Sequence, residues 1–316
     1  MNILVDIGGT YVRFAVEKNG KPSLFQKQLA SDHKSFEAAL QAYAFSVSAP
    51  AKNRVLIATA AHRDGAIWRF VNKNTWVIDP GSLRKKGFAV DLILNDFEAA
   101  TWGLVGLRKN NLRVLKKPHL KHPSSARCLL GPGTGLGLAY LHKMKKNHSV
   151  QPTMGGHLPA AAITAEQALI VQAVLRLKPR KGIVVYEDLV SGQGLLNIYN
   201  ALCNIDGIKP AAKTPQDIVQ AADKNPARAA LRLFHEFFAL CAATVVVSGN
   251  AFGGLYLTGG VMDRLIEDKK FNFPHFEKFF VPHLVPSVRQ ALDETGIYHV
   301  NDPALSLRGL LEAARA

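Results

Sequence analysis

The stretch Arg127-Cys-Leu-Leu-Gly131-Pro-Gly-Thr-Gly-Leu-Gly137 places an apolar run directly before a glycine-rich turn. The N-terminus has the same arrangement in Asn2-Ile-Leu-Val-Asp-Ile-Gly-Gly-Thr10. A buried strand that ends on glycines exposes backbone N–H groups where no Cβ obstructs an anion. Both turns lead into a second apolar segment, so each predicts a strand, a turn and another strand. Two such turns in one chain predict that a phosphate chain is bound from two sides, as in a nucleotide-binding protein.

Length and composition predict a globular protein of the cell interior. With 316 residues the chain is long enough for two domains, and 48% hydrophobic with 20% charged residues is ordinary for a folded protein. We expect no membrane association, because no run approaches the roughly 20 apolar residues of a membrane span. Cys128, Cys203 and Cys241 are far apart in apolar contexts, which predicts reduced, buried thiols and a cytoplasmic location.

The charge is unusual, at +15 with an isoelectric point near 9.8. It has two interpretations: a positive field for anionic substrates or polymers, or a solvated basic surface. The sequence shows no helix-turn-helix or zinc-finger spacing, so we favour the solvated surface and do not expect nucleic acid as a partner. The basic residues fall in short clusters that we place in solvated loops: 84–86, 116–117, 143–146 and 178–181.

Hydrophobic periodicity predicts strands and helices in alternation, and therefore an α/β fold with helices packed on mixed sheets. The two strand and glycine openings suggest a duplicated fold. Residues 106–125 carry Lys, Asn, His and Pro and form the best linker between two domains. The expected strands are 2–7, 11–17, 23–29, 54–59, 90–94, 127–130, 136–142 and 253–258, and the expected helices are 34–48, 96–105, 164–177, 188–203, 214–223, 227–248 and 303–316.

The first turn offers ligands for a phosphate and a cation. Asp6 ends the first strand, where a carboxylate can hold Mg²⁺ through water while Gly8, Gly9 and Thr10 donate to phosphate oxygens. An ordinary turn capped by aspartate and glycine is the alternative. Arg13 either adds a charged contact to the phosphate or is a surface charge.

The second turn is more specific, because a tight hairpin needs only one or two such residues. It lacks the lysine of a Walker A loop and precedes no helix, which excludes the usual P-loop and dinucleotide-binding motifs. We therefore interpret Gly131, Gly133 and Thr134 as part of a phosphate-binding hairpin.

Between these turns, Leu92-Ile-Leu-Asn-Asp-Phe-Glu98 delivers an Asn-Asp pair from an apolar strand to the start of a helix. Asn95 with Glu98 fits a helix-capping box, which is a purely structural interpretation. In the functional interpretation Asp96 accepts the proton of a substrate hydroxyl as it attacks the γ-phosphate. Asn95 beside it would suit a polyol.

Together these motifs make the chain similar to the bacterial glucokinases of the hexokinase and actin-like ATPase superfamily. The resemblance runs through Asp-Ile-Gly-Gly-Thr, Asn-Asp-Phe-Glu-Ala, Gly-Pro-Gly-Thr-Gly-Leu-Gly and Thr258-Gly-Gly260, in that order, and covers nearly the whole chain. It implies a ribonuclease H-like fold with a small α/β domain (1–105 plus 301–316), a large α/β domain (106–300) and an active-site cleft between them. It also implies ATP with Mg²⁺ as cofactors, a hexose substrate, a homodimer and no further metal.

The resemblance also assigns roles to individual residues. Asp96 would be the general base, while Asn95, Gly135, His157 and Glu187 would contact the sugar. Gly259 and Gly260 would lie near the adenosine. Without the surrounding motif we would instead interpret His157 as a loop or core histidine, and Glu187 as an ordinary residue in the first turn of a helix.

Met154 departs from the family pattern Glu-Gly-Gly-His, in which the glutamate accepts hydrogen bonds from the sugar. Methionine offers only a weak acceptor. Losing a charged acceptor costs about 1.5–3 kcal/mol, or roughly ten- to a hundred-fold in affinity.

The motifs and the resemblance together predict ATP-dependent phosphorylation of a hexose, most simply glucose. The alternatives are a kinase-derived sugar or nucleotide sensor, and a basic polyanion-binding protein.

Overall fold

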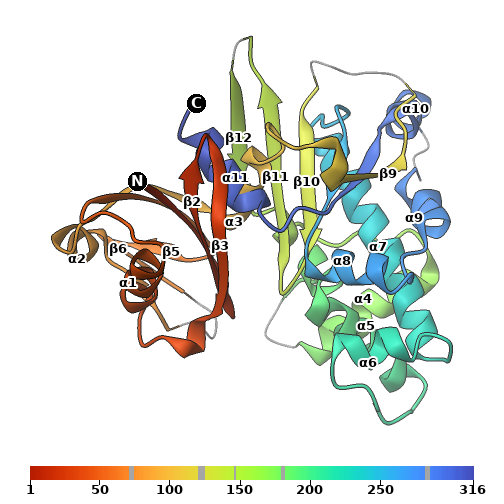
Figure 1. The fold of residues 1–316 in the computed structure, drawn as a ribbon. Helices are drawn as coiled ribbons and strands as arrows, with labels where there is room; N and C mark the ends of the chain where they lie inside the picture. The colour runs from red at the N-terminus through yellow and green to blue at the C-terminus, as the bar shows by residue number, and fades with distance from the viewer. Residues whose placement is uncertain (71–74, 120–124, 146, 179–181, 282–284) are drawn as a thin grey trace. The chain divides into compact units, whose positions relative to one another are not determined.

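The computed structural model describes residues 1–70, 75–119, 125–145, 147–178, 182–281 and 285–316. The chain, coloured by residue number in Figure 1, divides into two compact units. The first comprises residues 1–108, 144–152 and 302–316, and the second comprises 109–143 and 153–301. The two-domain α/β fold expected from the sequence is therefore confirmed, while the exact domain boundaries and the cleft stay predictions.

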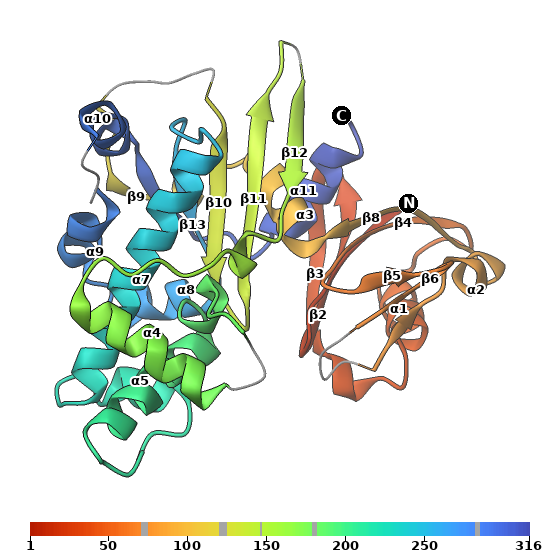
Figure 2. The ribbon, with the colours of Figure 1, turned by 180° about the vertical axis from the view of Figure 1, so that it is seen from behind.

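The first unit is built on a sheet with the order β3-β2-β1-β4-β8. β1 pairs antiparallel with β2 and parallel with β4, and β8 pairs parallel with β4. A small antiparallel sheet, β5-β6-β7, lies beside α1 and α2, as Figure 2 shows from behind. The elements are β1 (Asn2–Ile7), β2 (Tyr11–Lys18), β3 (Lys21–Leu29), α1 (Phe36–Ser46), β4 (Asn53–Thr59), β5 (His62–Asp64), β6 (Ile67–Arg69), β7 (Val77–Ile78), α2 (Pro80–Lys85), β8 (Phe88–Asn95), α3 (Asp96–Trp102), β12 (His148–Pro152) and α11 (Leu305–Ala313).

Helices cover both faces of this sheet, so the side chains of β1 point alternately into two different cores. Ile3, Val5 and Ile7 point into a core shared with α1 and α2. Leu4 points the other way, into a core formed with α3 and α11. A strand buried on both faces is apolar at nearly every position, as the first seven residues are. Asp6 shares the face of Leu4, so its carboxyl group lies on the side of the sheet that carries α3 and α11.

The second unit contains strands in the order β11-β10-β13-β14-β9 and a large set of helices around the 22-residue α7. Its core is the largest in the protein and includes Phe234, Phe237 and Phe238 of α7. The elements are β9 (Leu112–Lys116), β10 (Arg127–Pro132), β11 (Leu136–Lys143), α4 (Ala165–Leu177), α5 (Gly192–Ile205), α6 (Pro215–Gln220), α7 (Ala227–Ser248), β13 (Leu255–Leu257), α8 (Gly260–Glu267), α9 (Phe273–Phe280), α10 (Pro286–Glu294), β14 (Ile297–Val300) and the 3₁₀ turns η3 (Gly155–His157) and η4 (Tyr186–Asp188).

The suggestion of a duplicated fold agrees with the strand order. In the second unit β10 pairs antiparallel with β11 and parallel with β13, which pairs parallel with β14. The strand order β11-β10-β13-β14 thus matches the order β2-β1-β4-β8 of the first unit, and the relative directions of the strands are the same. Each glycine turn therefore lies at the same place in its sheet, after the first strand of a hairpin.

Polar residues at the helix starts explain most of the local boundaries. The side chains of Ser35, Asp79, Thr164 and Thr214 accept hydrogen bonds from backbone N–H groups in the first turns of α1, α2, α4 and α6. Such caps satisfy donors that the helix itself leaves unpaired. Proline at the first position of α2 and α6 further favours the start.

Several expectations from the sequence are corrected. The linker expected at 106–125 contains β9, which pairs antiparallel with β14 and belongs to the sheet of the second unit. Lys116 is therefore buried, not in a solvated loop, and its ammonium lies 3.1 Å from Asp293 Oδ1. The helix expected at 188–203 begins only at Gly192, because η4 precedes it. The prediction also lacked the short strands β5, β6, β7, β12 and β14 and the helices α2, α9 and α10.

Two expectations from the sequence, that the cysteines are buried thiols and that no segment spans a membrane, concern the second unit. All three cysteines are free and buried, as expected. α7 has the length and hydropathy of a membrane-spanning helix, yet 83% of its apolar window is buried within the protein. The core helix of a soluble protein has these same properties.

Candidate functional site

The carboxyl ends of three parallel strands meet at one edge of the first sheet. Ile7 of β1 is in register with Thr59 of β4, and Thr59 is in register with Asn95 of β8. The turn after β1 is closed by a hydrogen bond of 2.9 Å from the Gly8 N–H to the Tyr11 carbonyl. This edge thus brings the turn of Gly8, Gly9 and Thr10 together with the Asn95 pair, although some ninety residues separate them. Open α/β sheets bind ligands at such an edge.

Asp6 is a buried carboxylate with one charged partner. It is 7% exposed, and its Oδ2 lies 3.0 Å from Nη1 of Arg13, which is opposite in the β1–β2 register. Burial raises the pKa of Asp6 to about 6, Arg13 opposes that rise, and the negative charge of Asp96 adds to it. Of the two roles left open for Arg13, neither describes the structure fully, because its guanidinium is paired with Asp6.

Asn95 caps α3, as the capping-box interpretation predicts. Its Oδ1 accepts hydrogen bonds from the N–H groups of Phe97 at 3.0 Å and Glu98 at 3.4 Å. Asp96 is partly buried at the first position of the helix, and its Oδ1 accepts from the Phe97 N–H at 2.8 Å. Burial raises the pKa of Asp96, while these backbone donors and the Asn95 side chain oppose the rise. A carboxylate with a raised pKa is a stronger proton acceptor than an ordinary aspartate.

The helix that carries Asp96 is held by the C-terminal helix. A Cβ on Gly309 of α11 would lie 1.7 Å from the carbonyl oxygen of Ala99 in α3. Only glycine allows the two helices to approach this closely. The expectation of an amphipathic C-terminal helix is confirmed, but the sequence prediction did not include Gly309, whose position among apolar helix residues was the available signal.

In the second unit the hairpin between β10 and β11 forms a compact glycine loop. The Gly133 N–H donates to the Gly135 carbonyl at 2.8 Å, and the Gly192 N–H donates to the Gly133 carbonyl at 2.9 Å. Gly192 is the first residue of α5, which Ser191 caps. The loop therefore lies at the N-terminus of a helix, where the backbone partial charge favours anions. The prediction did not assign Gly192 to the site, although the Ser191-Gly192-x-Gly194 pattern is a helix-start signal.

The third glycine turn meets the same hairpin. The Thr258 N–H donates to the Leu130 carbonyl at 3.1 Å, and a Cβ on Gly259 would lie 2.6 Å from the Pro132 carbonyl oxygen. Gly259 has a φ of 98°, and α8 begins at Gly260. The structure thus brings Gly131, Gly133, Thr134, Gly259 and Gly260 together, with the N-termini of α5 and α8 at one end of the sheet.

The predicted sugar ligands of the second unit also converge. Glu187 Oε2 accepts a hydrogen bond from the Leu136 N–H at 2.9 Å, and a Cβ on Gly135 would lie only 2.5 Å from that oxygen. His157 is exposed at the end of η3, and the next residue, Leu158, accepts a hydrogen bond from the Tyr186 N–H at 2.9 Å. η3 and η4 are therefore neighbours. Glu187 lies in the 3₁₀ turn η4 and not in the first turn of an α-helix.

Met154 directly precedes η3, and its side chain is 82% exposed. Its carbonyl oxygen accepts a hydrogen bond from the His157 N–H at 2.9 Å. The side chain is not part of the core, so the structure does not require methionine here for packing. Substitutions at position 154 therefore change the surface chemistry beside His157 and leave the fold unaffected.

Comparison with solved structures identifies the fold class. A glucokinase from an Antarctic psychrotroph superposes with a TM-score of 0.83 at 22% identity, covering 99% of this chain and 98% of that one. A glucokinase from Balamuthia mandrillaris gives 0.79 at 20% identity, covering 100% and 93%. The chain thus shares the fold of these glucokinases, which confirms the two-domain, ribonuclease H-like (actin-like ATPase/hexokinase) fold class expected from the sequence.

Sequence comparison identifies the family. The glucokinase family model matches residues 3–316. A glucokinase of Hahella chejuensis is 30% identical over 98% of this chain and 95% of its own length. A glucokinase of Brucella abortus is 32% identical over 84% of this chain and 78% of its own length. The chain belongs to the glucokinase family.

Proposed function

We propose that this protein is an ATP-dependent hexose kinase that converts ATP and D-glucose to ADP and glucose 6-phosphate. The observation that carries the proposal is the position of Asp96. It is a partly buried carboxylate with a raised pKa at the carboxyl edge of three parallel strands, next to Asn95 and interacting with Asp6. Membership of the glucokinase family supports the reaction.

In this proposal Asp96 is the general base. The primary hydroxyl of the sugar gives its proton to the Asp96 carboxylate while its oxygen bonds to the γ-phosphorus of ATP. The bond between that phosphorus and the bridging oxygen breaks, and ADP leaves with the electron pair. Phosphoryl transfer needs positioning and charge neutralisation more than covalent help from the protein. Burial of Asp96 supports the role, because it brings the pKa of the base closer to neutral pH.

For the nucleotide, the second unit would supply the hairpin donors of Gly131, Gly133 and Thr134 and the start of α8 at Gly259 and Gly260. The first unit would supply Gly8, Gly9 and Thr10. A solved relative from Streptomyces griseus with glucose and AMPPNP bound supports an adenine nucleotide in a protein of this fold.

Mg²⁺ would be held by Asp6 together with the phosphates of ATP, and the residues present suit it. Carboxylate oxygens are ligands that Mg²⁺ prefers, and it usually keeps several waters. Among the described residues no group of three or more His, Cys, Asp or Glu side chains is placed to hold a metal. A site with one carboxylate and the substrate phosphates needs no such group. When bound, the ion would neutralise the charge that develops on the phosphates.

The sugar would be bound by Asn95, Gly135, His157 and Glu187. The fixed position of Glu187, whose Oε2 accepts from the Leu136 N–H, supports its role as an oriented acceptor for sugar hydroxyls. The solved relative from Balamuthia mandrillaris binds glucose. Met154 replaces the acidic residue of the family pattern, and we propose that it weakens glucose binding without abolishing it.

We also propose that the protein acts as a homodimer in the cytoplasm, at the entry of glucose into glycolysis. The three buried, free thiols support a reducing compartment. As domains of this enzyme we propose 1–105 with 301–316, and 106–300.

ATP consumption measured against a panel of hexoses and amino sugars tests the activity. Asp96→Asn is expected to lower kcat by about 10²- to 10⁴-fold, as the loss of a general base does, while nucleotide binding survives. Asp91→Asn is the matched control, because Asp91 lies on β8, the strand that leads into α3, is exposed and pairs with Arg54. Normal turnover by Asp96→Asn would remove Asp96 from the base role, and binding of nucleotide without turnover of any sugar would favour a sensor.

A further inference from the structure

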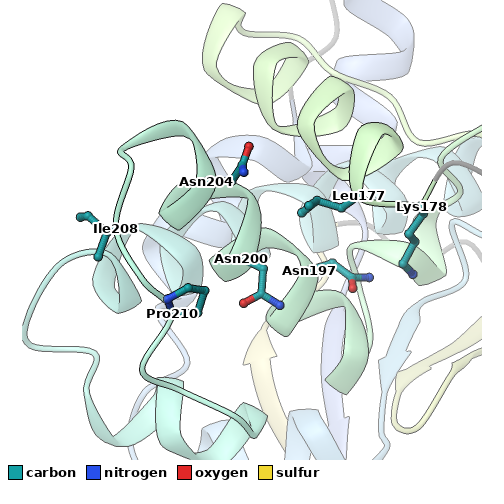
Figure 3. A pocket seen from close by; sticks show the side chains of 7 residues that line it. All are labelled: Leu177, Lys178, Asn197, Asn200, Asn204, Ile208 and Pro210. Carbon is teal, nitrogen blue, oxygen red and sulfur yellow. The ribbon is translucent and has the colours of Figure 1, made fainter.

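A cavity of mixed polar and apolar lining lies in the second unit, and its lining does not include the predicted sugar ligands. It has a volume of about 470 Å³ and lies between the end of α4, α5 and the segment that follows α5 (Figure 3). Ligand pockets commonly fall between roughly 300 and 1,000 Å³. None of Asn95, Gly135, His157 or Glu187 lines it.

One wall of the cavity is a row of side-chain amides. Asn197, Asn200 and Asn204 line it from α5. Their spacing of three and four residues places them on the same face of the helix. Each amide carries a donor NH₂ and an acceptor oxygen. The Asn197 amide is used within the protein, since its Oδ1 accepts from Gln193 Nε2 at 3.1 Å and its Nδ2 donates to the Asp188 carbonyl. A hydroxyl group is likewise both donor and acceptor, so the amides of Asn200 and Asn204 match a ligand rich in hydroxyls.

The remaining lining carries little net charge. Among the lining residues that the structure describes, Lys178 alone is ionisable, and its ammonium lies 2.9 Å from Oδ1 of the buried Asp188. This pairing offsets the positive charge, which disfavours an anion as the ligand. Leu177, Ile208 and Pro210 add apolar surface, against which the C–H groups of a sugar ring can pack.

The cavity is also connected to the turn that carries Glu187. Asn197 Nδ2 donates to the Asp188 carbonyl at 2.7 Å, and Asp188 Oδ2 accepts from the Val185 N–H at 3.1 Å. Asp188 is the neighbour of Glu187 in η4. Two residues of the cavity, Asn197 and Lys178, thus hold the turn that positions Glu187. A ligand that orders them would order this turn as well.

From this arrangement we propose that the cavity is a second binding site for a neutral sugar or polyol, and that its occupancy stabilises the turn of Glu187. Binding at this site does not depend on the proposed kinase activity. Its effect on sugar affinity at the first site does rest on that proposed function, so the two must be measured separately.

Hydrogen exchange measured by mass spectrometry, with D-glucose as the probe, separates the two sites. Glucose is expected to slow exchange in residues 197–208 of the wild-type protein. The double variant Asn200→Leu/Asn204→Leu should weaken that protection roughly ten- to a hundred-fold in glucose concentration, since two hydrogen-bonding groups are lost. Gln172→Leu is the matched control, because Gln172 is an exposed amide on α4 outside the cavity lining.

Ile208→Trp provides a second test that does not rely on α5. Ile208 is 47% exposed, so a larger side chain can fill the cavity without disturbing the core. This substitution should abolish protection of 197–208 and raise the KM for sugar while kcat stays unchanged.

The proposal is overturned if glucose does not slow exchange at 197–208 in the wild type, if both variants retain full protection, or if inorganic phosphate protects as well as glucose. Protection at 197–208 without any ATP turnover would leave this site standing and reject the kinase activity.

Discussion

Replacement of Asp6 by asparagine tests the electrostatics of the first unit. Burial raises the pKa of Asp6 from 3.8 to about 6. A rise of about 2 units corresponds to about 3 kcal/mol, at about 1.4 kcal/mol per unit. The folded state holds the proton more tightly than the unfolded state, so the stability associated with it is fully present below about pH 3.8 and is lost as pH rises through about 6. We therefore expect Asp6 to destabilise the apo protein at neutral pH.

Urea unfolding followed by tryptophan fluorescence measures this effect directly. Trp68, Trp76 and Trp102 are the three tryptophans of the chain, and all lie in the first unit. The free energy of unfolding of Asp6→Asn minus that of the wild type should become more positive by about 3 kcal/mol between about pH 4 and about pH 7. The Arg13 pair is already included in the pKa of Asp6, so it does not change this expected difference.

Asp64→Asn serves as the control for this experiment. Asp64 belongs to the same unit, its side chain is 60% exposed, and it pairs with Arg69 at 3.0 Å. Exposed ion pairs contribute little to stability, so we expect only a small change. A difference in unfolding free energy between Asp6→Asn and the wild type that stays constant across this pH range would refute the raised pKa of Asp6. A loss of activity together with a gain in stability would identify Asp6 as a residue kept for function.

Three further predictions concern packing and sugar recognition. Gly309→Ala should lower the free energy of unfolding of the first unit by about 1–3 kcal/mol, because the new Cβ meets the Ala99 carbonyl at 1.7 Å; tryptophan fluorescence in urea measures it. Gly135→Ala should raise the KM for sugar roughly tenfold in a steady-state assay, because the Cβ displaces Glu187 Oε2 from its bond to the Leu136 N–H. Met154→Glu should tighten glucose binding roughly ten- to a hundred-fold by calorimetry, at little cost in stability for an exposed side chain.

Each of these has a result that would contradict it. Ser306→Ala in α11 is the control for Gly309→Ala, and equal stability of the two variants would mean that α3 and α11 can separate freely. An unchanged KM in Gly135→Ala would show that Glu187 does not need its present position. If Met154→Glu binds glucose no better than the wild type, the missing carboxylate is not what limits affinity.

The motifs that depend on local backbone chemistry could be predicted from the sequence. Asn95 caps α3 as expected, because an asparagine before a helix accepts from the next N–H groups whatever surrounds it. The glycine turns after β1 and β10 were predicted for a similar reason, since a strand that ends on glycines leaves its backbone N–H groups uncovered by any Cβ. Strands buried on both faces, such as β1, are apolar at most positions and are easily recognised.

The elements that the sequence did not reveal depend on contacts between distant residues. β9 is short, with two basic residues among its five, and it becomes a strand only because β14 pairs with it and Asp293 neutralises Lys116. Its composition alone is typical of a linker. Arg13 likewise has no predictable partner until the hairpin register places it opposite Asp6. The structure also placed Gly192 at the glycine loop, through a hydrogen bond that spans 59 residues.

The sequence by itself determined the order of the motifs, the family and the chemical character of the candidate site, because these reside in residue types and short spacings. Only the tertiary structure determined the pKa shifts of the acidic residues in that site. Burial raises the pKa of both Asp6 and Asp96, and the negative charge of Asp96 raises that of Asp6 further; both effects exist only when the sheet and α3 are assembled. The cavity beside α5 is decided in the same way, because its amides are close neighbours only once the chain is folded.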